Sequence, residues 1–138
     1  MSSYLSARQE LAAALEAEWP VLYPGKPIYY ENGPSVDPAQ QGDLYLYVAF
    51  HFNDADLAHI GNSANMGYSF AGTVYIDVSV PLGSGMNKTY AVADALVNML
   101  KARSFASFFI AAPVLGDAKS VGGRCVASLA VPLRSHVA

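Results

Sequence analysis

A strict two-residue alternation between Tyr68 and Pro81 is the feature that most constrains the fold of this chain. One set of side chains in this stretch is apolar: Phe70, Val74, Ile76, Val78 and Val80. The intervening set is mostly small or polar: Ala71, Thr73, Tyr75, Asp77 and Ser79. Successive side chains of a strand point to opposite faces, so the pattern predicts a strand over 68–80 with one face buried. Pro81 is expected to end it because proline has no N–H for a sheet ladder.

The segment after this strand predicts a turn followed by a long amphipathic helix. Leu82-Gly83-Ser84-Gly85 supplies the turn, and the helix is expected over 86–103. An apolar stripe recurs along it with the helical period, at Thr89, Val92, Ala93, Leu96 and Leu100. At a rise of about 1.5 Å per residue, such a helix is long enough to cross several strands of a sheet.

The remaining elements are predicted from weaker patterns. A first helix is expected over 4–18, with Tyr4, Leu11, Leu15 and Trp19 on one side, and Pro20 is expected to stop it. Further strands are predicted near 28–31, 44–53, 108–115 and 123–134. Pro113 indicates that the fourth strand lies at an edge or carries a bulge. Residues 116–123 are predicted to form a turn region.

Residues 53–67 break the alternation and are rich in Asp, Asn, Gly, Ser and Ala. We expect a loop here. Loops of this length are usually functional or disordered, so we expect it to be mobile in a free subunit and ordered by a neighbour.

The order of elements predicts a two-layer α+β fold of one domain, residues 1–138. The order is α-β-β-β-α-β-β, and the connections are too short for crossover helices, which predicts a mostly antiparallel, mixed sheet of about five strands. Both helices are expected on one face of it, packing through Leu11, Leu15, Leu96 and Leu100. The predicted core below the sheet contains Val48, Phe50, Val74, Ile76, Val78 and Leu129.

The composition limits the possible functions. Only 14% of the residues are charged, below the usual quarter for a soluble domain. Either part of the apolar excess is buried between subunits, or the core is large and the surface is rich in Ser, Asn and Gln. The net charge of −3 without a basic cluster argues against tight phosphate binding. No apolar run approaches the ~18 residues of a membrane helix, and the first residues do not resemble a signal peptide, so we expect a cytoplasmic protein.

Residues that could carry chemistry are scattered. His51, His59 and His136 lack the spacing of metal ligands, and the single Cys125 excludes an internal disulfide and a cysteine-rich zinc site. Gly83-Ser84-Gly85 lacks the Gly-Lys-Ser/Thr of a phosphate-binding loop, and Asp77 and Asp94 form no recognisable carboxylate pair. Gly122-Gly123-Arg124 fits an anion site or a turn before a strand equally well. We therefore expect no catalytic site, no metal and no cofactor.

The whole pattern resembles the tail terminator proteins of long-tailed bacteriophages and prophages. The resemblance covers nearly all of the chain and lies in the order and texture of its segments. These are Ala7-Arg-Gln-Glu-Leu-Ala-Ala-Ala-Leu15, Pro27-Ile-Tyr-Tyr-Glu-Asn32, Tyr45-Leu-Tyr-Val48, Phe70-Ala-Gly-Thr-Val-Tyr-Ile-Asp-Val78, Pro81-Leu-Gly-Ser-Gly85 and Ala91-Val-Ala-Asp-Ala-Leu96.

The resemblance implies a structural, non-enzymatic protein of the virion tail, made in the host bacterial cytoplasm. Such proteins form a hexameric ring that caps the tail tube, stops its polymerisation and offers a surface to head-completion proteins. The implied partners are other copies of the chain, the tail tube protein and a head-completion protein, with DNA only passing through the lumen and no membrane. A mildly acidic ring would let DNA slide without sticking.

The expected subunit contacts lie on the outward strand face and the 53–67 loop, because tyrosine is enriched at interfaces. The candidate residues are Tyr45, Tyr47, His51, Tyr75, Asp77, His59 and Ile60. Two other functions remain open at this point. One is a related head–tail connector or neck protein, and the other is a small-ligand-binding α+β oligomer of bacterial metabolism.

Overall fold

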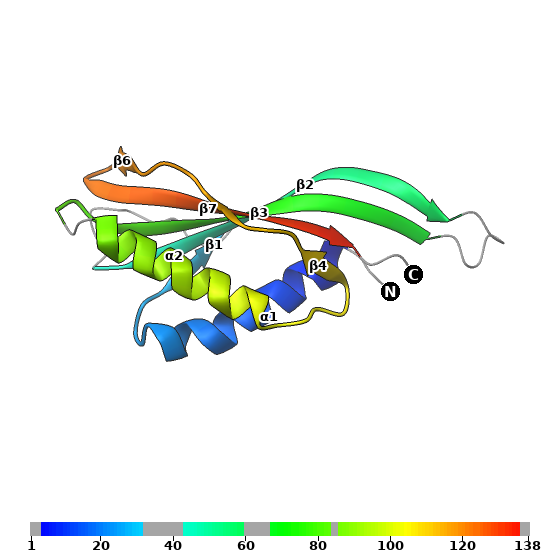
Figure 1. Ribbon diagram of the computed structural model, residues 1–138, viewed down its shortest axis with the longest axis horizontal. Coiled ribbons are helices and arrows are strands. Elements are labelled where there is room, and N and C mark those ends of the chain that lie inside the picture. The colour runs from blue at the N-terminus through cyan, green and yellow to red at the C-terminus, as the bar shows by residue number, and fades with distance from the viewer. Residues whose placement is uncertain (1–3, 32–42, 60–66, 84–85, 136–138) are drawn as a thin grey trace.

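Two helices cover one face of a long, twisted β-sheet in the computed structural model, which describes residues 4–31, 43–59, 67–83 and 86–135 (Figure 1). The elements in chain order are α1 (Tyr4–Leu22), β1 (Ile28–Tyr30), β2 (Tyr45–His59), β3 (Gly67–Pro81), α2 (Met86–Lys101), β4 (Phe108–Ile110), β5 (Val114–Leu115), β6 (Lys119–Val121) and β7 (Arg124–Ser135). The two-layer α+β class is confirmed.

The sheet has the order β1-β2-β3-β7-β4, and β5 and β6 also pair with β7. The pairing of β1 with β2 is parallel, and every other pairing is antiparallel. This confirms the mixed, mostly antiparallel sheet. Residues 116–123, expected to be only a turn region, also contain β6, which turns back onto β7 through Gly122 and Gly123.

The single strand expected over 108–115 is instead two short strands, β4 and β5, at an interrupted edge of the sheet. Ile110 pairs with Leu133 and Val114 pairs with Ala130, so four steps along the edge match three steps along β7. The edge therefore contains one extra residue at this point. The same shift recurs between β5 and β6. Each extra residue is a bulge, which bends the edge locally. The sequence predicted an edge or a bulge at Pro113; the structure shows an edge with a register shift there, and a second shift follows it.

The hydrophobic core lies between the helices and the inner face of the sheet. The helix residues predicted to pack there, Leu11, Leu15, Leu96 and Leu100, are all buried in one cluster with the alternating strand residues Val48, Val74, Ile76, Val78 and Leu129. Phe50 is only half buried and packs against the cluster's edge. The period-2 and period-3.6 patterns therefore identified the inner faces correctly.

The prediction that α1 stops at Pro20 is wrong, because the helix continues to Leu22. Trp19 is buried, and its indole N–H donates to the carbonyl of Lys26 at 2.8 Å. The backbone N–H of Tyr23 donates to the carbonyl of Trp19 at 2.8 Å, which closes the last turn. Packing and these two bonds hold a helical turn that proline alone would disfavour.

The prediction of a loop over 53–67 is also wrong for most of that stretch. β2 runs on to His59 and β3 begins at Gly67, with pairs from Asp54↔Ala71 to His59↔Gly67. Register shifts after Phe52 and after Leu57 mark bulges in β2. Residues 60–66, including Ile60, lie outside the described residues, and the expected mobility of the loop stays a prediction.

The paired segments 54–59 and 67–70 form what we call the ribbon arm. Among the described residues, β7 pairs with β3 only from Ala71 onward. Beyond that point the sheet narrows to two strands, which extend past the ends of both helices (Figure 1). The backbone hydrogen bonds of the antiparallel ladder join these two segments.

Gly72 allows β2 and β3 to approach closely at the root of the ribbon arm. A methyl group at this position would lie 2.7 Å from the backbone oxygen of His51 and 3.2 Å from the Cα of Phe52. We expect Gly72→Ala to lower the free energy of unfolding by about 1–3 kcal/mol, because the strands must shift apart. Urea unfolding measures this. Gly116→Ala is the control, since its nearest atom would be 3.5 Å away, and equal midpoints for the two variants would contradict the prediction.

Candidate functional site

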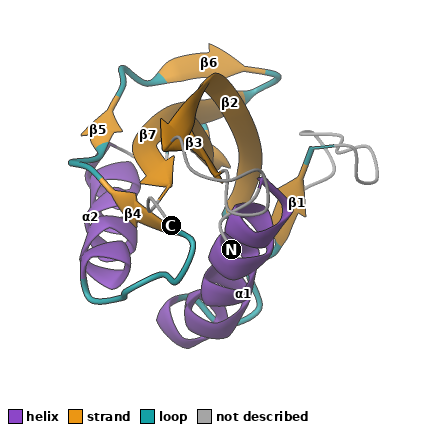
Figure 2. Cartoon of the chain, turned by 90° about the vertical axis from the view of Figure 1, so that its right-hand side faces the viewer, coloured by secondary structure: helices purple, strands orange, loops and turns teal. Residues whose placement is uncertain are grey.

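Both helices lie on one side of the sheet, and neither covers the opposite sheet face (Figure 2). We call it the open face. Strand pairing places its side chains in rows, one running Tyr29, Tyr47, Asp77 and Ser128 and the next running Ala49, Tyr75, Ala130 and Val114. Tyr75 is 40% exposed and Val114 is 62% exposed. Tertiary structure thus brings aromatic and aliphatic side chains from five strands onto one surface.

Charge is scarce in the middle of the open face. Asp77 is half buried, and its carboxylate accepts a hydrogen bond from the hydroxyl of Ser128 on β7. A cavity of about 470 Å³ lies beside this pair and is lined by Asp77, Gly116, Asp117, Lys119, Val126 and Ser128. Its charged residues Asp117 and Lys119 come from the edge segment around β6. The centre of the open face therefore has the low charge typical of the core of a protein interface.

Arg124 crosses the open face from β7 to β2 and ties three strands together. Arg124 is 4% exposed. Its Nε donates to Ser79 Oγ at 2.7 Å. Its Nη2 donates to the carbonyl of Ser79 at 3.0 Å and to the carbonyl of Asp43 at 2.6 Å. The guanidinium carbon lies 4.7 Å from the centre of the Tyr45 ring. The sequence allowed Gly122-Gly123-Arg124 to be either an anion site or a turn before a strand. These contacts of Arg124 favour the turn. Both glycines have positive φ, 56° and 77°, which suits a two-residue hairpin turn.

Asp43 anchors the start of β2 to the helix layer. Its carboxylate pairs with Lys88 in the first turn of α2 and lies 3.6 Å from Lys26 Nζ. The hydrogen bond from Lys88, followed by the positive charges of Lys88 and Lys26, lowers the pKa of the Asp43 carboxyl. Together with Arg124, this fixes the end of the sheet that lies opposite the ribbon arm.

An aromatic cluster fixes the root of the ribbon arm to α1. The Tyr4 ring lies 4.7 Å from the Phe52 ring and 5.0 Å from the Phe70 ring, measured between centroids. Arg8 lies over Phe50, and its Nε pairs with Glu31 Oε1 at 3.8 Å. Such contacts supply packing and cation–π attraction at the point where the sheet begins to narrow.

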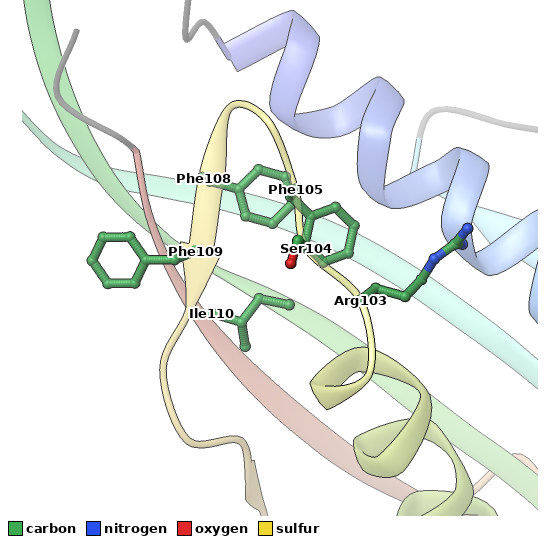
Figure 3. Close-up of a pocket in the computed structure, with 6 residues that line it drawn as sticks. All are labelled: Arg103, Ser104, Phe105, Phe108, Phe109 and Ile110. Carbon is green, nitrogen blue, oxygen red and sulfur yellow. The ribbon is translucent and has the colours of Figure 1, made fainter.

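Two further cavities lie on the helix side and contain no pair of groups suited to acid–base chemistry. One, of about 160 Å³, is lined by Arg103, Ser104, Phe105, Phe108, Phe109 and Ile110, with Phe109 pointing to the opposite side of β4 from Phe108 (Figure 3). The other, of about 660 Å³, lies between α1 and α2. Arg103 lines both and forms an ion pair with Glu18 at 3.9 Å. The cavities are gaps beside packed aromatic and helical surfaces.

The family of phage tail terminator proteins matches residues 8–104, well over half of the chain. The chain belongs to this family. Tail terminators are structural, non-enzymatic components of the virion tail, and membership implies an interaction with the tail tube. No curated protein matches the chain.

Solved structures show the same fold. One solved chain is 17% identical to this terminator, covers 97% of it and 96% of its own length, and superposes with a TM-score of 0.66. A chain from the virion of a native gene transfer agent particle is 16% identical, covers 96% of this terminator and 98% of its own length, and has a TM-score of 0.57. At these identities the likeness establishes the fold alone.

The structure places the predicted contact residues of the terminator in different settings. Tyr47, His51, Tyr75 and Asp77 lie together on the open face. Tyr45 was expected on the same surface, but it is only 7% exposed. Arg124 packs on its ring, and the centroid of the Tyr29 ring lies 5.5 Å from that of Tyr45. The backbone of His59 lies in the ribbon arm.

The sequence interpretation missed Tyr29, Val114 and Arg124 as parts of the open face. Tyr29 and Val114 belong to short strands without an alternation of their own, so only pairing with β2 and β7 assigns them to this surface. An arginine after two glycines does not indicate, from sequence alone, which strands its side chain contacts.

Three other kinds of site can be checked on the described residues of the terminator. They contain no group of three His, Cys, Asp or Glu side chains that could hold a metal ion. None of their helices is long and apolar enough to cross a membrane. Asp77 lies on the open face and Asp94 is exposed on α2, on opposite sides of the sheet, so these two carboxylates do not form a pair. Cys125 packs half buried against the core.

Proposed function

We propose that this terminator assembles head to tail into a ring, hexameric as the family resemblance implies, that caps the tail tube and stops its polymerisation. The opposite surface of the ring would receive head-completion proteins, while DNA passes through the lumen. Assembly would take place in the host bacterial cytoplasm. The net charge of −3 suits a lumen that does not hold DNA tightly.

The observation that carries this proposal is the open face. A two-layer fold buries only one side of its sheet, and the other side here exposes Tyr75 and Val114 around a centre with one hydrogen-bonded carboxylate. Contiguous apolar surfaces of this kind mark interaction sites. A head-to-tail ring joins two different patches of each subunit, and we assign the open face, with Tyr47, His51, Tyr75 and Asp77, to one of them. Tyr45 would support this patch through its contact with Arg124, and His59 and Ile60 stay predicted contacts.

Tyr75→Glu is expected to abolish ring assembly without unfolding the subunit. Tyr75 is exposed in the subunit, so a carboxylate is tolerated there, but an unpaired charge buried at an interface costs several kcal/mol. Since 1.4 kcal/mol is a tenfold change, the dissociation constant of the subunit contact should rise at least about 100-fold. Light scattering at high concentration, and electron microscopy with purified tail tubes, measure the assembly.

Tyr90→Glu is the matched control for this experiment. Tyr90 is 48% exposed on α2, on the helix side of the molecule, so the same change of charge should leave the ring intact. Both variants should keep the thermal midpoint of the unmodified protein. If folded, unmodified subunits bind no tail tubes at any concentration, the terminator function itself is wrong. If Tyr75→Glu rings form normally, the open face is not the contact.

A further inference from the structure

The outer edge of β2 is paired over only part of its length among the described residues. β1 pairs with Leu46–Val48, and the N–H of Leu46 donates to the carbonyl of Pro27 at 3.1 Å. One step further, the N–H of Phe50 donates to the carboxylate of Glu31 at 2.8 Å. The even-numbered residues of this part of β2 therefore direct their backbone N–H and C=O groups away from β3. Among the described residues, Phe50 is the last of them with a hydrogen-bond partner on that side.

The bulge after Phe52 changes which residues face outward. On β3, the N–H of Phe70 donates to Ser135 Oγ at 2.8 Å, so Phe70 directs its backbone groups away from β2. Its neighbours Ser69 and Ala71 therefore direct their backbone groups toward β2. Ser69 pairs with Asp56, and Ala71 pairs with Asp54. Since backbone groups alternate along a strand, Ala55 and Leu57 direct their N–H and C=O groups to the outer edge of the ribbon arm.

This edge needs a partner for two physical reasons. A two-stranded ribbon is marginally stable in water and gains stability from a third strand. A row of unpaired N–H and C=O groups is also a template for pairing with another chain. Edge pairing of this kind supplies main-chain hydrogen bonds without requiring a particular side-chain sequence.

We propose that the outer edge of β2 from Phe52 to Leu57 pairs with the β4–β6 edge of a second copy of this chain. The inference rests on the proposed ring and names the contact that closes it. The two edges lie on opposite sides of the same sheet, so joining them is head to tail and repeats around a ring. Pairing of β2 with β2 would instead give a two-fold dimer, which cannot cap a tube. Continuing the sheet between subunits also pairs this exposed edge of β2 in the closed ring.

Ala55→Pro tests the proposal because it removes one outward N–H from this edge. Proline is tolerated at an edge strand whose N–H faces away from the neighbouring strand, so the bonds of Asp54 and Asp56 to β3 should persist. We expect a folded subunit that no longer forms rings in solution or on purified tail tubes. Ala55→Gly is the control, since it keeps the N–H, and it should assemble like the unmodified protein.

Residue-resolved hydrogen exchange of the unmodified protein is the second measurement, and it does not depend on any variant folding. On assembly, the amides of Ala55 and Leu57 should exchange at least about tenfold more slowly, as a new backbone hydrogen bond requires. The amides facing β3 should change less. Amides of β6 and of the adjoining edge should gain protection in the same sample.

The outcomes separate this inference from the proposed function. Rings that form with Ala55→Pro, or that leave the amides of Ala55 and Leu57 unprotected, overturn the edge contact while the terminator ring stands. A stable dimer in place of a ring overturns the choice of the opposite edge. If the unmodified protein neither assembles nor binds tail tubes, the ring and the edge contact are both wrong.

Discussion

Trp19→Ala is expected to lower the free energy of unfolding by about 3–5 kcal/mol, the usual cost of deleting a buried tryptophan side chain. Trp19 is 1% exposed, belongs to the core cluster and packs on Tyr23 with ring centroids 4.9 Å apart. Its truncation leaves a cavity in the core cluster and removes the donor to the Lys26 carbonyl. The last turn of α1, which contains Pro20, then loses the contacts that hold it.

Urea unfolding followed by circular dichroism measures the change, and Trp19→Phe separates its two causes. Phenylalanine keeps most of the buried volume but has no indole N–H, so Trp19→Phe should cost about 1–2 kcal/mol, in the range of one hydrogen bond and a modest change of shape. If Trp19→Phe costs as much as Trp19→Ala, the hydrogen bond to Lys26 dominates. An unchanged midpoint for Trp19→Ala would mean that α1 does not pack as described.

Ile76→Ala is expected to cost about 2–5 kcal/mol, because Ile76 lies at the centre of the inner sheet face and is fully buried. It pairs with Val48 on β2 and Leu129 on β7, and both helices pack over this face. The cavity left by three deleted carbons cannot collapse easily between two paired strands.

Ile76→Val should give a graded loss of about 0.5–1.5 kcal/mol, since it deletes one methylene group from the same site. Thr73→Ala is the control on the open face and should change stability by no more than about 0.5 kcal/mol. Equal stability losses for Ile76→Ala and Thr73→Ala would assign the two sheet faces the wrong way round. Differential scanning calorimetry of the three variants checks this.

Stability and the proposed assembly are therefore expected to depend on opposite faces of one sheet. The inner face, with Ile76, is occupied by α1 and α2, and substitutions there are expected to unfold the subunit. The open face, with Tyr75, is one residue away along the same strand, and a charge there is expected to affect only the contact between subunits. Because successive side chains alternate, neighbouring positions of β3 can be tested for the two roles separately.

The sequence by itself determined the inner layer of this terminator. A buried strand face requires an apolar residue at every second position, and a packed helix requires one every three or four, so Val74, Ile76, Val78, Leu96 and Leu100 could be assigned without a structure. The order of elements and the resemblance of segments such as Phe70–Val78 to tail terminators led to the family that the comparison establishes.

Tertiary structure alone decided the features that depend on contacts between distant segments. The ribbon arm continues the β2–β3 ladder through residues 54–59, and backbone pairing of this kind does not require a particular side-chain pattern. Pro20 stays helical because the neighbouring Trp19 is buried. Tyr45 is covered on the open face by Arg124, which lies 79 positions later in the chain. These outcomes depend on which distant segments meet, and a local pattern carries no information about contacts between residues far apart in sequence.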